Sequence, residues 1–311
     1  MWFLFSILTT LSWGITDLFY KMGSDSKDRY SHLKTGIMVG FVMGIHAIFF
    51  MLIKGVTFDP LDIIKYLPVS FFYILSMMIG YWGLRYIELS ISSPVQNSSG
   101  AITAVVLMIL FPQQIKAINI VGIILVTVGV IGLAFVEKRL QTAAQKSENK
   151  SIDPKYQIGV LAITFPIIYA IIDSIGTIAD GIYLDKLELI SEDAALLAYE
   201  FTWLLFAIVA FIYIVFVKKE KFNVLKEPVR GSAALFETAG QFFYVYAMSG
   251  NSVITAPIIA SYSIVAVILS HIFLKEKLSK SHYLLIIIPI FIKYLNVNIV
   301  PTYLLSMNPD Y

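Results

Sequence analysis

The sequence predicts an all-α polytopic membrane protein with ten transmembrane helices in two inverted five-helix repeats. Three observations lead to this fold class: an apolar composition, long apolar runs separated by short charged clusters, and a motif that recurs in both halves of the chain. Hydrophobic residues make up 58% of the 311 residues and charged residues 14%, against roughly 25% charged residues in soluble domains. The composition therefore excludes a soluble globular protein.

The apolar runs are long enough to be helices that cross a membrane. A bilayer core requires about 20 apolar residues per helix, and each backbone polar group must find its partner inside the segment. A β-barrel would show short segments of alternating polarity instead. The ten expected helices span 2–21, 33–53, 66–87, 92–111, 117–136, 157–179, 195–217, 231–248, 253–273 and 281–300.

The first apolar run and the longest polar segment define the organisation of the chain. The first run lacks a basic n-region and an obvious cleavage site, so we expect a retained helix and not a signal peptide. Residues 138–156 are rich in Lys, Gln, Ser and Glu and predict a solvated linker. The repeats would occupy 1–137 and 157–311. Because each has five helices, the second enters the membrane from the opposite side.

The basic residues predict the orientation in the membrane. Loops after the odd-numbered helices hold most of the 23 Lys and Arg residues, whereas the even-numbered loops hold few, such as Lys54 and Lys116. Cytoplasmic loops of membrane proteins carry the excess of these residues. We therefore expect a multi-pass protein of the cytoplasmic membrane with both termini outside.

Paired prolines give the first sign of internal symmetry. Pro94 followed by Ser98 recurs as Pro257 followed by Ser261, at an offset of 163 residues (257 − 94). Weak internal symmetry among apolar spans is typical of transporters. Each proline either kinks its helix, freeing carbonyl groups toward a cavity, or simply begins a helix. The sequence is compatible with both.

A second correspondence involves acidic residues inside the expected helices. A shift of 156 residues (173 − 17) places Trp13 on Tyr169 and Asp17 on Asp173. Charged groups within a membrane cost a few kcal/mol each by insertion scales, so each needs a partner or a function. In inverted repeats the two Asp residues would lie toward opposite faces, and we expect them to couple or gate transport. Asp17 could instead pair with Lys21 at the end of its helix.

Two glutamates are the further candidates for substrate binding. Glu237, Gln241 and Tyr244 follow the i, i+4, i+7 spacing of one helix face, with helix packing through Gln241 as the alternative. Glu200, flanked by Tyr199 and with Trp203 one turn later, predicts a cage for an organic cation, because ring faces attract ammonium groups by roughly 0.5–2 kcal/mol each. Aromatic residues near helix ends also form interfacial belts. The remaining residues expected to line a cavity are Tyr81, Asn97 and Tyr262.

Three features of the chain match a known pattern. They are a Trp–small pair in the first helix, an aromatic third helix leading into a Ser-rich fourth, and a signature after the ninth helix: Trp13-Gly14, Tyr81-Trp82-Gly83-Leu84-Arg85-Tyr86, Ser90–Ser93 and Leu274-Lys275-Glu276-Lys277-Leu278-Ser279. On these residues the chain resembles the EamA branch of the drug/metabolite transporter superfamily over essentially its whole length. The resemblance implies ten helices, inverted repeats and a central polar cavity with alternating access. The turn at 111–115 departs from the pattern because it lacks the expected acidic residue.

The sequence therefore predicts a secondary active transporter of a small polar metabolite. No GxxxxGK[ST] motif is present, so an ion gradient or exchange must supply the energy. The excess of carboxylates over cationic partners favours an organic cation such as a quaternary amine or polyamine. A proton-coupled amino-acid or metabolite exporter would explain the same carboxylates. The absence of HExxH and GxGD motifs disfavours an intramembrane enzyme, and inverted repeats disfavour a channel.

Composition also limits the expected partners. The chain has no cysteine, which excludes disulfides and thiolate chemistry, and a net charge of +2 is too small to suggest nucleic-acid binding. We expect no cofactor and no metal. The expected partners are the lipid bilayer, a small-molecule substrate and protons as the candidate coupling ion, in a monomer or homodimer.

Overall fold

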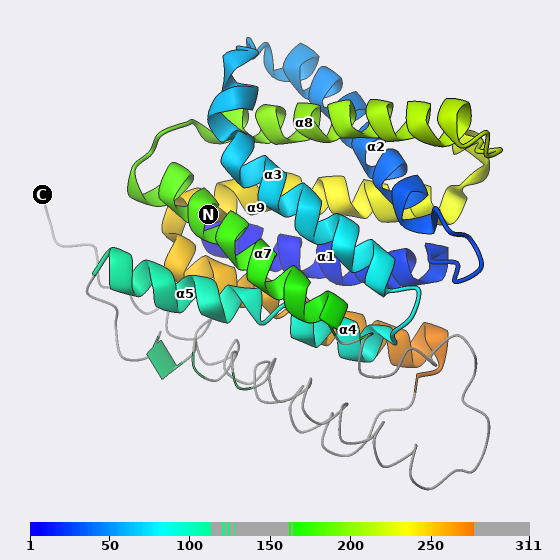
Figure 1. The fold of residues 1–311 in the computed structure, drawn as a ribbon. Coiled ribbons are helices and arrows are strands. Elements are labelled where there is room, and N and C mark those ends of the chain that lie inside the picture. Colours follow the sequence, from blue (N-terminus) through cyan, green and yellow to red (C-terminus); the bar gives the residue numbers. More distant parts are fainter. Residues whose placement is uncertain (113–119, 122–123, 125–127, 129–161, 163, 277–311) are drawn as a thin grey trace, which may run out of the picture.

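The computed structural model describes residues 1–112, 120–121, 124, 128, 162 and 164–276. Every element within this part of the chain is helical, and the long helices lie side by side in one bundle (Figure 1). The long helices are α1 (Trp2–Gly23), α2 (Ser31–Lys54), α3 (Leu61–Gly83), α7 (Thr164–Gly181), α8 (Glu192–Ile212) and α9 (Pro228–Ala260). The shorter elements are α4 (Leu89–Gln96), α5 (Ser99–Leu110), α10 (Tyr262–Leu269), the π-helical turns η3 (Ile182–Lys186), η4 (Tyr213–Val217) and η6 (Ser270–Leu274), and the 3₁₀ turn η5 (Val224–Lys226).

Seven helical stretches in the described residues are long and apolar enough to cross a membrane. They coincide with expected helices. The expected helix at 157–179 is described from Thr164 onward, and the stretch Pro228–Leu274 contains the two expected at 231–248 and 253–273. The expected helices at 117–136 and 281–300 fall largely outside the described residues. The helical, multi-pass character of the chain is thus confirmed for the part that the structure describes.

The last of these stretches, Pro228–Leu274, crosses the bundle twice. It is interrupted at Asn251, whose φ of −170° and ψ of 89° are not helical. Before the interruption it runs antiparallel to α1, because Gly250 lies against Trp2 and Gly240 against Trp13. After it the chain runs parallel to α1, because the hydroxyl of Thr10 donates to the carbonyl of Ile258 at 3.3 Å and Gly14, one turn later, lies against Tyr262 and Val265. In Figure 1 the yellow part of α9 passes beside α1 and the orange part returns below it.

The paired prolines mark two similar breaks. Pro94 lies inside α4, which ends two residues later, and Pro257 lies inside α9, which ends three residues later. The chain then turns and continues as α5 and α10. Because a proline inside a helix removes one backbone hydrogen bond and crowds the preceding turn, the kink interpretation is confirmed and that of a helix-starting proline is not. The broken helices touch where Gly100 lies against Ala260.

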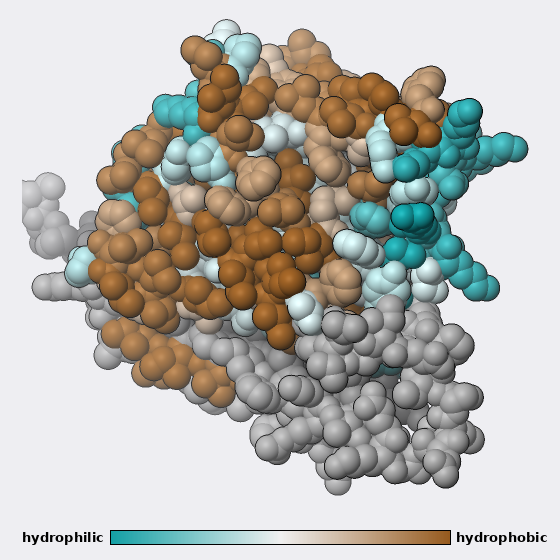
Figure 2. All heavy atoms as spheres, in the orientation of Figure 1, coloured by the Kyte–Doolittle hydropathy of each residue, from teal (hydrophilic) through white to brown (hydrophobic). Residues whose placement is uncertain are grey.

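The outer surface of the bundle suits a lipid environment. Large apolar side chains cover most of the face shown in Figure 2, and the hydrophilic residues gather at its right-hand edge. Ile53, Phe49 and Leu205 are among the exposed apolar side chains. Patches of this extent are rare on soluble proteins, whereas in a bilayer they face acyl chains.

The helices of the two predicted repeats pair in a pattern that has two-fold character. α1 packs against α9, α3 against α7, and α2 against α8. In the predicted repeats α1, α2 and α3 correspond to α7, α8 and α9. Exchanging corresponding helices converts the α1–α9 pair into the α7–α3 pair and leaves the α2–α8 pair unchanged. This is the pairing that two related repeats produce. The division at 1–137, 138–156 and 157–311 stays a prediction, because the linker lies outside the described residues.

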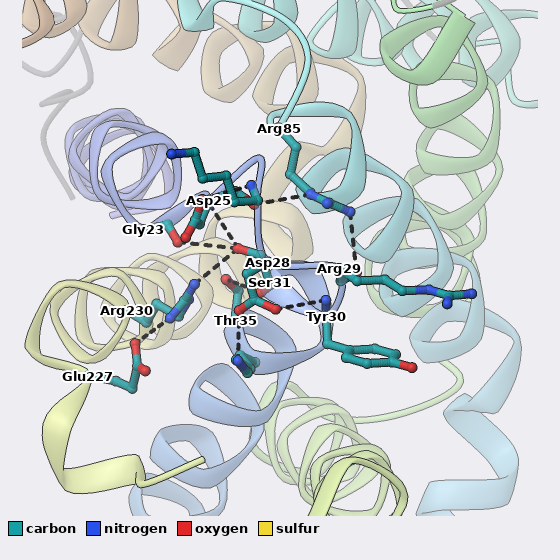
Figure 3. Close-up of polar contacts among 12 residues, drawn as sticks. Gly23, Asp25, Asp28, Arg29, Tyr30, Ser31, Thr35, Arg85, Glu227 and Arg230 are labelled. Carbon is teal, nitrogen blue, oxygen red and sulfur yellow. Dashed lines mark hydrogen bonds and ion pairs between the residues drawn. The ribbon is translucent and has the colours of Figure 1, made fainter. Parts of the chain in front are cut away.

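Arginine side chains close one end of the bundle (Figure 3). The guanidinium group of Arg85, which follows α3, donates to three carbonyl oxygens of the 24–30 loop, at 3.0 to 3.3 Å. Arg230 at the start of α9 donates to the hydroxyl of Ser31 at 3.0 Å and pairs with Glu227. These contacts tie the end of α3 and the start of α9 to the loop between α1 and α2 and to the first residue of α2.

Asp28 adds an ion pair to the same end. Its carboxylate accepts from Lys34 at 2.7 Å and from the backbone N–H of Tyr30 at 2.9 Å. Burial raises the pKa of Asp28, but these two hydrogen bonds and the positive charges of Lys34 and Arg230 outweigh it, so the pKa lies below its ordinary value. The pair therefore stays charged at neutral pH.

Glu276 belongs to the signature noted after the ninth helix, and the structure gives it a role. Its carboxylate accepts the backbone N–H groups of Leu89 and Ser90 at 3.2 and 3.0 Å. These groups open α4 and have no intrahelical acceptor. A negative charge at a helix N-terminus is also favoured by the helix dipole. Glu276 thus caps the broken fourth helix from the opposite half of the chain.

Removing this cap should destabilise the protein. We expect Glu276→Ala to lower its stability by about 1–2 kcal/mol, the typical loss when a helix N-terminal acceptor is deleted. Thermal unfolding in detergent micelles measures the effect, with the exposed Glu220→Ala as the matched control. Equal melting temperatures for the two variants would contradict the capping role.

Candidate functional site

A cavity lies at the centre of the described bundle, between α1, α3, α7, α9 and the two broken helices. Its volume is about 70 Å³, room for several water molecules, since one needs about 10–15 Å³. Most residues predicted for the site line it: Trp13, Asp17, Tyr81, Asn97, Tyr169, Asp173, Glu237, Gln241, Tyr244 and Tyr262.

Asp17 faces this cavity from α1. The hydroxyl of Ser93, at the break of the fourth membrane-spanning segment, donates to its carboxylate at 2.5 Å. The alternative of a pair with Lys21 at the helix end is not favoured, because the ammonium group of Lys21 donates to the carbonyls of Leu84 and Ile87 at 2.8 and 2.5 Å. Asp17 is therefore buried within the bundle and held by a neutral hydroxyl.

Asp173 occupies the corresponding position on α7. Hydroxyl groups of Ser99 and Ser76 donate to its two oxygens at 2.7 and 3.3 Å. Tyr169, one turn earlier, and Thr177, one turn later, line the cavity from the same helix face. Both aligned Asp residues thus reach one cavity and accept from a serine of the broken fourth helix.

Glu237 is the third carboxyl group of the cavity. The phenol of Tyr20 donates to its carboxylate at 3.1 Å, and the indole N–H of Trp13 donates to its backbone carbonyl at 3.4 Å. Gln241 and Tyr244 continue the same face of α9 into the cavity. The predicted stripe is therefore geometrically as expected, while its role in transport stays a prediction.

Aromatic rings form much of the remaining wall. The ring of Trp13 lies 5.0 Å from that of Tyr244 and 5.8 Å from that of Tyr262, measured between centroids. Tyr20 packs against Tyr81 at 4.5 Å. Aromatic rings in the wall of a cavity can attract a cation through their faces.

Two cavity tyrosines, Tyr20 and Tyr73, were not singled out from the sequence, and Tyr199 was named only as the neighbour of Glu200. Tyr20 follows Asp17 by three residues and Trp13 by seven. Tyr244 likewise follows Glu237 by seven. Applying the helix-face rule to α1 would have found it. Tyr73 precedes Tyr81 by eight residues, again on one face. Tyr199 was expected in a cage around Glu200, and the structure places it in the central cavity without Glu200.

Two glycines give the aromatic residues their places. A Cβ atom at Gly240 would lie 2.4 Å from the Trp13 ring, and one at Gly80 would lie 2.8 Å from the Tyr169 ring. Each ring therefore lies directly on the backbone of a helix from the other half of the chain. This parallel is consistent with the alignment of Trp13 and Tyr169.

Glu200 and Trp203 do not line the cavity, so the expected cage with Tyr199 is not formed there. Successive residues on a helix lie about 100° apart. With Tyr199 facing the cavity, Glu200 points toward α2, where both its oxygens contact Nδ1 of His46, at 2.8 and 2.9 Å. Trp203 is fully buried, edge-on to Phe206.

The charge of the cavity is one-sided. Among the described residues that line it, Asp17, Asp173 and Glu237 are acidic and none is Lys, Arg or His. Buried carboxylates without a cationic partner are strongly unfavourable. A proton or a bound cation would remove this cost. Chemically, the site can hold a positive charge between carboxylates and ring faces.

Comparisons with known proteins identify the family and the fold of the chain. The model of the EamA-like transporter family matches residues 1–135 and 159–297. A solved structure described only as "Crystal structure of protein" is similar with a TM-score of 0.60 at 12% identity, over 91% of this chain and 96% of that chain, which shows a shared fold. No curated protein matches. Because the family model covers most of the chain, the protein belongs to the EamA-like transporter family of the drug/metabolite transporter superfamily.

Proposed function

We propose that this membrane transporter moves a small organic cation, of the quaternary amine or polyamine class, by alternating access. The observation that carries the proposal is the cavity with three carboxyl groups, an aromatic wall and no basic residue among its described lining. An ammonium group bound there would gain charge compensation from a carboxylate and attraction from ring faces. A substrate anion would find only like charge.

Energy for transport would come from an ion gradient, most simply protons. When the site is empty, protons on the carboxyl groups remove the unfavourable buried charge. Cation binding can then displace them, which couples the two flows in opposite directions. On this proposal Glu237 is the substrate carboxylate, and Asp17 and Asp173 gate or couple.

The proposal also covers the membrane, the orientation in it and the oligomeric state. The chain would reside in the cytoplasmic membrane with the Arg85–Arg230 end inside, as the positive-inside rule suggests, and so with both termini outside. The two five-helix repeats would tilt relative to one another. The protein would act as a monomer or homodimer.

Electrophysiology on solid-supported membranes tests the substrate class. Proteoliposomes are exposed to choline, tetramethylammonium, putrescine or alanine, with and without a pH gradient. We expect currents evoked by the amines and none by alanine, because alanine carries no net charge to match the carboxylates. Protein-free liposomes and the Glu237→Gln variant serve as controls.

The other outcomes are informative. Currents from alanine that require a proton gradient would overturn the cation proposal and favour a proton-coupled exporter of neutral metabolites. Amide side chains of Asn97 and Gln241 in the cavity could then bind a zwitterion. Silence with every amine in folded protein would also reject the substrate class.

A further inference from the structure

Asp180 is a buried carboxyl group of α7 that does not line the cavity. It is completely inaccessible to solvent, and its Oδ1 accepts a hydrogen bond from the phenol of Tyr66 on α3. Its Oδ2 is buried without a hydrogen-bond partner in the described structure. In such surroundings the neutral, protonated carboxyl group is accommodated far better than the carboxylate.

The groups that face Asp180 come from every helix packed around it. Tyr66 and Tyr73 lie on α3, Tyr199 on α8 and Tyr244 on α9. Acidic groups of its own chain segment are Asp173 and Asp185, the latter paired with Lys186 at 2.8 Å. The aromatic hydroxyls are neutral. A charged Asp180 would therefore lack a counter-ion among these neighbours.

Hydroxyl groups connect Asp180 to the cavity. Tyr244 interacts with its carboxyl group and shares a hydrogen bond with Tyr73. The hydroxyl of Tyr73 donates to that of Thr177 at 3.1 Å. Tyr73, Thr177 and Tyr244 all line the cavity. The chain of hydroxyls thus begins at Thr177, which donates to the backbone carbonyl of Asp173 at 2.9 Å, and ends at Asp180.

Asp180 lies on the way from the cavity to the end opposite Arg85. It follows Asp173 by seven residues, about 10 Å along the helix. Gly181 lies against Ser252, just after the break in α9, and against Leu107 near the end of α5. Tyr66 lies near the start of α3. All of these mark the same end of the bundle.

We propose that Asp180 is a second proton-binding site, outside the substrate cavity, and that Tyr244 and Tyr73 relay protons between the two. The inference rests on proton coupling in the proposed function. A proton leaves the Asp180 carboxyl for the hydroxyl of Tyr244, Tyr244 passes its own proton to Tyr73, and Tyr73 passes its own to water in the cavity, which delivers it to a deprotonated cavity carboxylate. The carboxylate is then reprotonated from the aqueous phase at its end of the bundle.

Two measurements on the purified full chain test this. Infrared difference spectra recorded across a pH titration detect the C=O band of protonated carboxyl groups and need no substrate. Asp180→Asn should remove one titrating component, whereas Asp185→Asn, its matched control, should leave the spectrum of this component unchanged. An unaltered titration in Asp180→Asn would overturn the proposal.

The second measurement separates proton transfer from substrate movement. In proteoliposomes with labelled choline, Asp180→Asn should lose uptake driven by a pH gradient by about 100-fold or more, the contribution of a positioned proton-transfer group. Equilibrium exchange of choline should remain close to wild type, because it needs no net proton flow. Loss of both activities in folded protein would assign Asp180 a structural role instead.

Additional outcomes keep the two proposals distinct. If the wild type moves no amine, the substrate class fails, but the infrared result still decides whether Asp180 binds a proton. If Asp180→Asn does not fold, Tyr66→Phe replaces it, because losing the hydroxyl on Oδ1 must move the pH at which the carboxyl band titrates. A titration identical to wild type in Tyr66→Phe would refute the assignment.

Discussion

Glu237→Gln is expected to abolish transport while leaving the protein folded and inserted. The amide retains the size of the side chain and can still accept from Tyr20, whose phenol donates to Glu237 at 3.1 Å. It cannot carry the negative charge that matches a bound cation. Losing a partner of a buried charge costs about 3 kcal/mol or more, so uptake should fall by about 100-fold or more.

Labelled choline uptake into proteoliposomes measures the effect, and size-exclusion profiles establish that the variant is folded. The control is Glu188→Gln, which removes an exposed carboxylate far from the cavity lining. Uptake at the wild-type rate would exclude Glu237 from the mechanism. Because the prediction concerns one residue, that result would leave Asp17 and Asp173 as candidates.

Gly240→Ala should reduce transport as strongly without altering any polar group. The added Cβ would lie 2.4 Å from two atoms of the Trp13 ring, which must move. That ring packs on Tyr244 and Tyr262 and forms part of the cavity wall. A misplacement of about 1 Å in a binding site can cost about 100-fold in rate.

The matched control is Gly231→Ala, on the same helix. Its Cβ would meet only Met38, at 3.5 Å, an ordinary contact, and alanine is the better helix former by about 1 kcal/mol. We therefore expect wild-type transport and unchanged or higher thermal stability for Gly231→Ala. Equal uptake by the two variants would show that the position of Trp13 does not matter for transport.

The sequence was most informative for features that depend on a single helix and not on how helices pack together. Run lengths placed each helix that the structure describes, because a membrane span has a fixed length. The stripe from Glu237 to Tyr244 was correct because helical spacing alone sets which residues share a face. The missing N–H group of proline marked Pro94 and Pro257 as places where a helix either breaks or begins, and the structure decides for the break.

Contacts between distant segments could not be read from the sequence in the same way. Whether Tyr199 or Glu200 faces the cavity depends on how α8 rotates against α2, and no local pattern sets that rotation. The cap that Glu276 supplies to α4 joins segments far apart in the chain. Likewise, the serine that binds Asp17 is 76 residues away.

The close contact at Gly100 has a mechanical consequence. A Cβ at this residue would lie 2.5 Å from that of Ala260 and 2.8 Å from the carbonyl oxygen of Ala256, so the two broken helices meet backbone to backbone. The two backbones cannot come closer at this contact, and we expect the helices to pivot about it. If the two broken helices pivot about this contact, they separate at one end of the bundle only while they approach each other at the opposite end. A bound cation would then meet one aqueous phase at a time.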